Sequence, residues 1–188
     1  MSYLLKPLQV GTLRLNNRLV MPPMATAKAE SDGKVSQDIL DYYKEKSEGG
    51  NISLIIIEHS FITPEGKASK NQISVSDDNM IEGLRKLADV IHQNGSKAIM
   101  QLNHAGSAAE KEVIGTMPVG PSAVINPRKG NIPRELTNKE IEDIIQAFHD
   151  AARRTKEAGF DGVEIHSAHG YLLNQRSEEH TSELQSQD

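Results

Sequence analysis

The sequence predicts an α/β fold in which helices cover a parallel sheet, organised as a (β/α)8 TIM barrel of which only the first four strands are present. Apolar, β-branched runs alternate along the chain with segments of helical periodicity, as in parallel strands joined by crossover helices. Polar and titratable residues follow the predicted strands at their carboxyl ends, as they do around the active face of such a barrel. A β-hairpin is expected before the first strand.

The strands are predicted from their composition and from the residues that end them. Residues 8–15 alternate apolar and polar side chains around Gly11-Thr12, which indicates a two-residue hairpin. The run Ile52–Ile57 is largely apolar and β-branched, as in a strand buried on both faces. Pro22-Pro23 ends the strand before it, because proline cannot donate to a sheet ladder. We expect buried strands at residues 18–21, 52–57 and 97–102, and a short buried strand around 163–165.

Three helices are predicted from apolar spacing and from capping residues. Ser36 is a suitable N-cap for the first helix, and Asp77 or Ser76 for the second. The third helix opens with the capping box Thr137–Glu140 and ends at Gly159. The apolar faces assigned to the core contain Ile39, Leu40, Tyr43, Met80, Leu84, Leu87, Ile91, Ile141, Ile144, Ile145, Phe148 and Ala152. The segment between the third strand and the third helix is too long for a plain connector, so we expect it to be functional.

The composition excludes several classes of function. The net charge is −5, which argues against nucleic acid or an anionic membrane surface as the main partner. The sequence contains no cysteine, so neither a disulfide framework nor a thiolate metal site can form within it. No apolar run approaches the ~20 residues that span a bilayer, and the N-terminus lacks the features of a signal peptide. The cytoplasm is therefore the expected compartment.

The most informative stretch follows the predicted fourth strand and contains His166, His169 and Tyr171. Two neutral imidazole N–H groups can hold a carbonyl oxygen and stabilise negative charge that develops on it. A tyrosine beside them can supply a proton. Gln101 and His59 stand at the ends of neighbouring predicted strands, so we expect all these side chains at one edge of the sheet.

Other interpretations of these residues stay open at the level of the sequence. A zinc site is one of them, although no HExxH helix is present. Its ligands would be His166, His169 and one of His59, His104 or Glu58. A hydrogen bond that only supports the loop backbone is the alternative role for Gln101. Glu58 and Glu164 lie in or at the ends of buried strands, so we expect them to be hydrogen-bonded barrel residues rather than acid–base catalysts.

Five segments, taken together, carry a family resemblance. They are Asn17–Met24, Gln101–Gly106, Gly120–Ala123, Ala158–His166 and His169–Gln175. In their order and spacing across residues 3–175 they resemble the old yellow enzyme family of FMN-dependent NAD(P)H:flavin oxidoreductases, or ene reductases. The resemblance implies a flavoenzyme built on a TIM barrel.

The resemblance also implies where FMN would lie. The backbone after the first strand would wall the flavin ring, and Gln101 would hydrogen-bond its pyrimidine side. His59 would sit beside the flavin, where the family often has a small residue. Ala25 occupies a position that is often Thr or Cys in the family, so this flavin contact is expected to be absent. The residues implied to bind the cofactor are Pro22, Pro23, Met24, Ala25, His59 and Gln101, and no metal is implied.

The implied reaction has two halves. NAD(P)H reduces FMN and leaves, and an enone or enoate then binds with its oxygen on His166 and His169. Hydride passes from the flavin to the β-carbon, and Tyr171 would donate a proton to the α-carbon. The expected partner is therefore a small molecule with an activated alkene, and a homo-oligomer is left open for the intact protein.

Residues 176–188 do not continue the family pattern. They are polar, lack periodicity and resemble the in-frame translation of a sequencing-adapter oligonucleotide. We expect residues 1–175 to form the N-terminal half of the barrel and residues 176–188 to be a non-native, disordered tail, with a genuine solvated tail as the alternative. A half-barrel exposes sheet edges and lacks the strands that form the phosphate site, so the fragment alone is expected to be inactive.

Three alternative functions remain beside the ene reductase. One is a larger flavoenzyme of the same family, similar to dienoyl-CoA reductase, with an iron–sulfur cluster beyond residue 175. Another is a TIM-barrel metal-dependent hydrolase that uses the histidines as ligands. The last is a folded fragment without catalysis.

Overall fold

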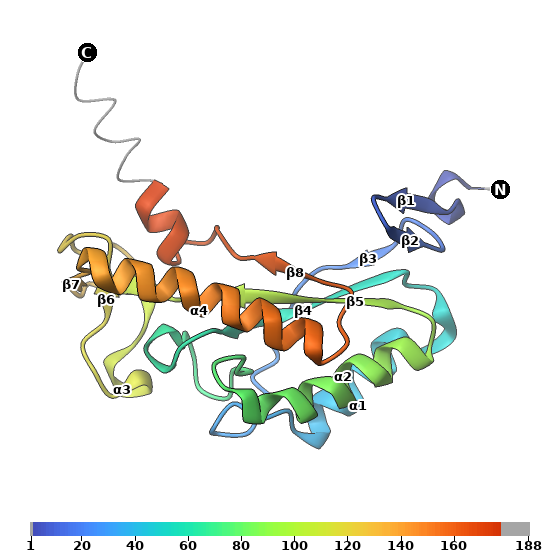
Figure 1. Ribbon diagram of the computed structural model, residues 1–188, viewed down its shortest axis with the longest axis horizontal. Helices are drawn as coiled ribbons and strands as arrows, with labels where there is room; N and C mark the ends of the chain where they lie inside the picture. The colour runs from blue at the N-terminus through green and yellow to red at the C-terminus, as the bar shows by residue number, and fades with distance from the viewer. Residues whose placement is uncertain (1, 178–188) are drawn as a thin grey trace, which may run out of the picture.

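A computed structural model describes residues 2–177 and contains a parallel four-stranded sheet with the order β3-β4-β5-β8. The long helix α4 lies across one face of this sheet, beside the neighbouring pair α1 and α2 (Figure 1). The sheet strands are β3 Val20–Met21, β4 Leu54–Phe61, β5 Lys97–Asn103 and β8 Gly162–Ile165. The helices are α1 Gln37–Ser47, α2 Ile81–Gln93, α3 Lys111–Ile114 and α4 Asn138–Glu157. The predicted α/β class, with the first four strands of a barrel, is confirmed.

The N-terminal hairpin forms as predicted. Strands β1 (Leu8–Val10) and β2 (Leu13–Leu15) pair antiparallel, with Leu8 opposite Leu15. Gly11 in the turn has a φ of 56°, a conformation that glycine adopts without steric cost. The sequence pattern therefore located both strands and the turn.

The core lies between the sheet and the helices. Ile55 and Ile57 of β4 and Met100 of β5 are fully buried, as expected for central strands. Helix α2 adds a buried stripe at helical spacing. The residues of that stripe are Leu84, Leu87, Ala88 and Ile91.

The predicted N-caps are confirmed, whereas the C-cap of α4 is Ala158, one residue before the predicted Gly159. The Ser36 hydroxyl accepts from the Ile39 backbone N–H at 3.2 Å. Asp77 and Ser76 were the two candidate caps for the next helix, and the structure selects Asp77. Its side chain caps a single 3-10 turn (Asp78–Met80), which leads directly into α2. Thr137 and Glu140 form a reciprocal capping box at the start of α4, where each side chain accepts from the other's backbone.

Two strands that were expected to be buried are exposed edges. Strand β3 pairs only with β4 and β8 only with β5, so each has one open side within residues 2–177. Val20 is 45% exposed and Ile165 is 45% exposed, and Val163 is nearly as open. Their apolar sequences identified both strands, but burial also requires a strand on each side, and residues 2–177 place a strand on only one side of β3 and of β8.

The second strand also extends further than predicted. It was expected to end at residue 57, whereas β4 runs to Phe61 and carries a register shift against β5 between Ile57 and Ser60. Glu58 and His59 therefore lie inside a strand, at a β-bulge, rather than after its end. Bulges commonly re-aim side chains next to functional sites.

The segment between β5 and α4 contains short elements of its own. They are a 3-10 turn (Gly106–Ala108), α3, and the paired strands β6 (Val119–Gly120) and β7 (Arg134–Glu135). After β8, residues 172–177 form a helical turn. This turn includes Arg176 and Ser177, the first two residues of the expected tail, and residues 178–188 lie outside the described part of the chain. Among the helices of residues 2–177, none has the length and apolarity needed to cross a membrane.

The buried hydroxyl of Tyr43 offers a test of the packing beneath the sheet. It accepts the Glu58 backbone N–H at 3.0 Å, and the whole side chain is inaccessible to solvent. Tyr43→Phe leaves this N–H without a partner, so we expect a loss of about 1–3 kcal/mol in the free energy of unfolding. Urea unfolding measures the loss, with the half-buried neighbour Tyr42→Phe as the control. Equal stability of the two variants would show that the bond contributes nothing.

The open strand edges predict self-association of the isolated 188-residue chain. Unpaired N–H and C=O groups on β3 and β8, flanked by exposed Val163 and Ile165, favour edge-to-edge pairing. Sedimentation velocity should show species larger than a monomer that increase with concentration. The double variant Val163→Lys/Ile165→Lys should shift the distribution toward monomer, whereas a wild-type chain that stays monomeric throughout the concentration series contradicts the prediction.

Candidate active site

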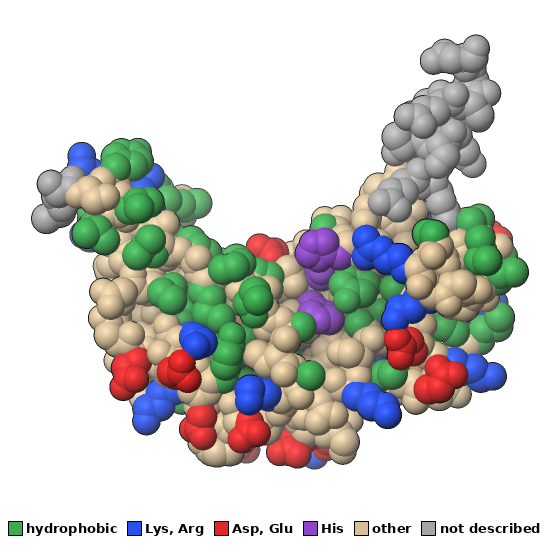
Figure 2. All heavy atoms as spheres, turned by 180° about the vertical axis from the view of Figure 1, so that it is seen from behind, with side chains coloured by type: hydrophobic (Ala, Val, Ile, Leu, Met, Phe, Trp, Pro, Cys, Tyr) green, Lys and Arg blue, Asp and Glu red, His purple; other side chains and the backbone are tan. Residues whose placement is uncertain are grey.

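Four ring-bearing side chains predicted from the sequence lie together at the carboxyl end of the sheet. The His166 ring centroid is 5.0 Å from Tyr171 and 5.2 Å from His169, both edge to face. The His59 ring is stacked on Tyr171 at 5.6 Å and lies 6.3 Å from His166. Histidine side chains are visible on the face opposite α4 (Figure 2). The structure thus brings residues from β4 and from the segment after β8 into one cluster.

The parallel strands and a tight turn position this cluster. The His166 backbone N–H donates to the Leu102 carbonyl at 2.9 Å, which continues the β5–β8 pairing by one residue. His169 then adopts a φ of 58° and turns the chain. Gly170 donates its N–H to the Asn174 side chain at 2.7 Å and accepts from Gln175 Nε2 at 2.7 Å. These bonds hold the turn that carries His169 and Tyr171.

Two histidines of the cluster, His59 and His166, are held in their neutral forms. Burial lowers the pKa of His59 to about 4, and the fields of His166 and His169 add to the effect. Burial also lowers the pKa of His166, with a further contribution from His169 and an opposing one from Glu164. Neutral imidazoles are hydrogen-bond donors through one N–H each.

Tyr171 keeps its proton near neutral pH. Burial raises the pKa of its phenol, and this outweighs the opposing fields of Lys129 and Arg128. The phenol can therefore donate a proton but does not carry a negative charge. Both cations come from the segment between β5 and α4, and Arg128 Nη1 also donates to the His169 carbonyl at 3.0 Å.

Gln101 lies on β5 next to this cluster and is held by Glu164. Its Nε2 donates to Glu164 Oε1 at 2.6 Å, across directly paired positions of β5 and β8. Glu164 thus has the supporting role that was expected for it. The Oε1 atom of Gln101 has no hydrogen-bond partner within residues 2–177 and is not among the buried polar atoms that lack one, so it stays available to a ligand.

Glu58 anchors the segment after β3. Its carboxylate accepts the Thr26 backbone N–H at 2.6 Å and is almost completely buried. Burial raises the pKa of this carboxyl, and the bonds from Thr26 oppose the shift. The preceding residues remain open to solvent, with Met24 half exposed, so they present a surface along the edge of the sheet. These residues, proposed as the flavin wall, are Pro22, Pro23, Met24 and Ala25.

The zinc alternative finds no support. Within residues 2–177 no group of three His, Asp or Glu side chains has an arrangement that could hold a metal ion. His104, one of the suggested third ligands, is fully buried away from the ring cluster. Its Nδ1 accepts the Gly106 N–H at 3.1 Å, and its ring packs so closely on Gly66 that a Cβ there would lie 2.6 Å from it. His104 therefore has a structural role, which the sequence pattern alone could not separate from a catalytic one.

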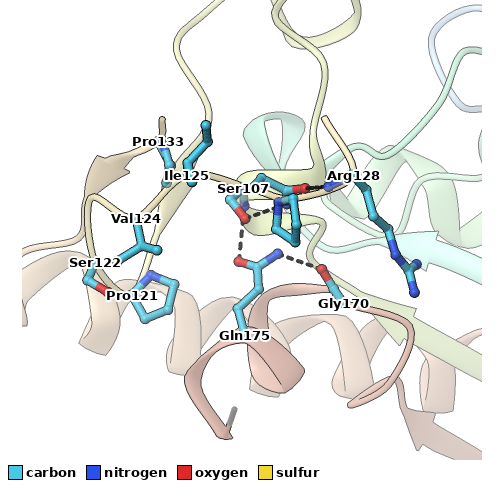
Figure 3. A pocket seen from close by; sticks show the side chains of 11 residues that line it. Ser107, Pro121, Ser122, Val124, Ile125, Arg128, Pro133, Gly170 and Gln175 are labelled. Atoms are coloured by element: carbon cyan, nitrogen blue, oxygen red, sulfur yellow. Dashed lines mark hydrogen bonds between the residues drawn. The ribbon is translucent and has the colours of Figure 1, made fainter. Parts of the chain in front are cut away.

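A cavity of about 340 Å³ lies beside the cluster rather than at it. It is formed by the segment between β5 and α4 together with the turn after β8 (Figure 3). Gln175 bridges the two parts, because its Oε1 accepts the Ser107 N–H at 3.1 Å and its Nε2 donates to Gly170. None of the residues expected to be catalytic lines this cavity, but Arg128 does. The sequence predicted that this long segment is functional, but it did not identify the residues that line the cavity.

Two buried polar residues near His59 were missed at the sequence level. Gln72 contacts the His59 ring at Nδ1, with 3.0 Å between the nitrogens, and Asn103 approaches the same atom at 3.4 Å. Gln72 belongs to the segment after β4, in which no motif was recognised. Only its position in space connects it to the cluster.

The fold and the cluster define a class of protein, an α/β enzyme with a histidine cluster at the carboxyl edge of a parallel, barrel-type sheet. The sequence also matches the model of the NADH:flavin oxidoreductase / NADH oxidase family over residues 3–183. The chain belongs to this family, which confirms the resemblance noted above. The match runs past residue 175, into the segment expected to be a non-native tail.

Curated relatives and solved structures agree with this assignment. The chain is 47% identical over 169 residues to an NADH oxidase of Thermoanaerobacter brockii, which covers 89% of this chain and 26% of the relative. It is 44% identical over 163 residues to an NADH:fumarate oxidoreductase of Klebsiella pneumoniae strain 342, covering 86% of this chain and 17% of the relative.

The structure is similar to an old yellow enzyme homologue from Zymomonas mobilis, with a TM-score of 0.84, 30% identity, and coverage of 91% of this chain and 50% of that one. It is similar to a 2-naphthoyl-CoA reductase complex with a TM-score of 0.86 and 30% identity, over 92% of this chain and 28% of that one. The chain therefore spans about half of the first relative and about a quarter of the second.

The buried histidines predict a pH dependence of stability. Burial lowers the pKa of His59 and of His104 to about 4, compared with 6.5 in the unfolded chain. Between these values the unfolded chain binds more protons, so the free energy of unfolding falls as the pH falls from 6.5 toward 4. In urea unfolding at pH 7 and pH 5, His104→Gln should reduce this loss by about 1–2 kcal/mol. The same loss in both proteins would contradict a depressed pKa at His104.

Proposed function

We propose that the protein to which this chain belongs is an FMN-dependent oxidoreductase that moves hydride from NAD(P)H, through the flavin, to the activated C=C bond of an enone or enoate. The observation that carries the proposal is the cluster of His59, His166, His169 and Tyr171 beside Gln101 at the carboxyl edge of the sheet. Membership of the NADH:flavin oxidoreductase family supports the redox chemistry. The substrate is then a small molecule.

The residues at the sheet edge are suited to a flavin. Gln101 offers a free carbonyl oxygen to an imide N–H, because Glu164 has already engaged its amide nitrogen. The open segment Pro22–Ala25 offers backbone and apolar surface to an aromatic ring, and Glu58 holds its far end in place. His59 lies between this region and Tyr171. When bound, FMN supplies the hydride chemistry, and the protein provides position and polarity.

The remaining residues act on the substrate. His166 and His169 donate N–H groups to its carbonyl or carboxylate oxygen and stabilise the negative charge that develops there. His166 can do so as a neutral donor, without protonating the oxygen beforehand, because burial and the field of His169 lower its pKa. Tyr171, whose phenol stays protonated, donates a proton to the α-carbon.

A chimera tests this function, since the chain covers only part of its relatives. Residues 1–175 replace the matching segment of the Thermoanaerobacter NADH oxidase, and the reduction of 2-cyclohexenone by NADH is followed. His166→Ala should slow turnover of the enone by about 10²–10³-fold, the cost of one lost oxyanion donor, while reduction of the flavin by NADH continues. His149→Ala, on the exposed side of α4, is the matched control. A chimera that binds no flavin, or a His166→Ala variant with unchanged enone turnover, would contradict the proposal.

A second candidate is a larger flavoenzyme of the same family with further domains and an iron–sulfur cluster. The curated relatives, which share the higher identity, favour it, since this chain covers only 26% and 17% of them. Because the chain has no cysteine, cluster ligands would have to come from residues outside it. The nucleotide sequence across and beyond codons 174–188 decides between the two candidates. Cysteines at iron–sulfur spacing downstream support the larger enzyme, and their absence supports the simple ene reductase.

A further inference from the structure

His59 is set apart from the other members of the cluster by a buried partner that fixes its protonation pattern. Gln72 is only 2% exposed and contacts both the backbone and the ring of His59. The orientation of the Gln72 amide follows from two backbone contacts. Its Oε1 accepts the Ala68 N–H at 2.7 Å, and its Nε2 donates to the His59 carbonyl at 3.0 Å. Since a backbone N–H can only donate and a carbonyl can only accept, the oxygen and nitrogen of the amide cannot be exchanged.

The tautomer of His59 follows from this orientation. Gln72 Nε2 carries hydrogens and lies 3.0 Å from His59 Nδ1, so Nδ1 must be the acceptor. Asn103 Nδ2, at 3.4 Å, approaches the same atom as a second donor group. In the neutral ring the hydrogen then resides on Nε2. Within residues 2–177 the Nε2 atom has no hydrogen-bond partner, and it is not among the buried atoms that lack one, so it is open to a ligand.

We propose that Gln72 is a positioning residue that fixes the Nε2–H tautomer of His59, so that His59 presents an N–H donor to the ligand of the site it shares with His166 and His169. This inference rests on the proposed function and adds one donor to the residues that it assigns to the site.

The experiment that tests this inference determines the tautomer of His59 in the 188-residue chain, without any flavin. Magic-angle-spinning NMR of the ¹⁵N-histidine-labelled chain is suitable because it tolerates self-association. We expect a protonated Nε2 and an unprotonated Nδ1 for His59 at pH 7. In Gln72→Glu the side chain still accepts from Ala68 but can no longer donate, so the proton should move to Nδ1. Gln9→Glu, in the exposed hairpin, makes the same charge change and should leave the tautomer as it is. A wild-type His59 with a protonated Nδ1 overturns the positioning role, even if Gln72→Glu does not fold.

This experiment uses neither flavin nor turnover, so its outcome is separate from that of the chimera.

Discussion

The parallel register of three strands is the constraint on which the rest of the site depends. Pairing of β4 with β5 and of β5 with β8 places Gln101 opposite Glu164 and brings His59 to the same edge as His166. A shift of one residue in either pair would turn these side chains to the opposite face, because side chains alternate along a strand. The buried apolar face of β4 and β5 prevents such a shift, so the hydrophobic core determines which side chains reach the site.

Buried polar side chains then connect the strands to the loops that complete the site. Glu58 holds the segment after β3, Gln101 joins β5 to β8, and Gln72 joins the segment after β4 to His59. Each of these bonds is within 3.0 Å and each involves a group that is mostly removed from water, where an unpaired polar atom is costly. Loss of one partner would therefore be expected to loosen a specific loop rather than the whole fold.

Much of the fold follows from the sequence because its signals are local. Caps such as Ser36 and Thr137, the hairpin turn at Gly11 and the apolar stripe of α2 act within a few residues, and all were found where expected. Exposed sheet edges were expected of a half-barrel, but the exposure of Val163 and Ile165 in particular depends on which strands lie beside β8 and has no local signal. His104 and Gln72 show the same limit. His104 was considered as a metal ligand but is a buried structural residue. Gln72 lies in no recognised motif but contacts His59. Both roles depend on contacts between residues that are distant in the sequence.

The neutrality of the histidines explains why such a site is suited to stabilising a transition state. A protonated histidine would attract an anionic substrate strongly before any reaction, and that attraction would lower the ground state as well. Neutral N–H donors gain most where negative charge increases during the reaction, so their contribution is larger in the transition state. Burial and the fields of the neighbouring rings keep His59 and His166 in this form. Crowding of the rings thus favours the neutral form of these two histidines down to a lower pH than an exposed histidine would allow.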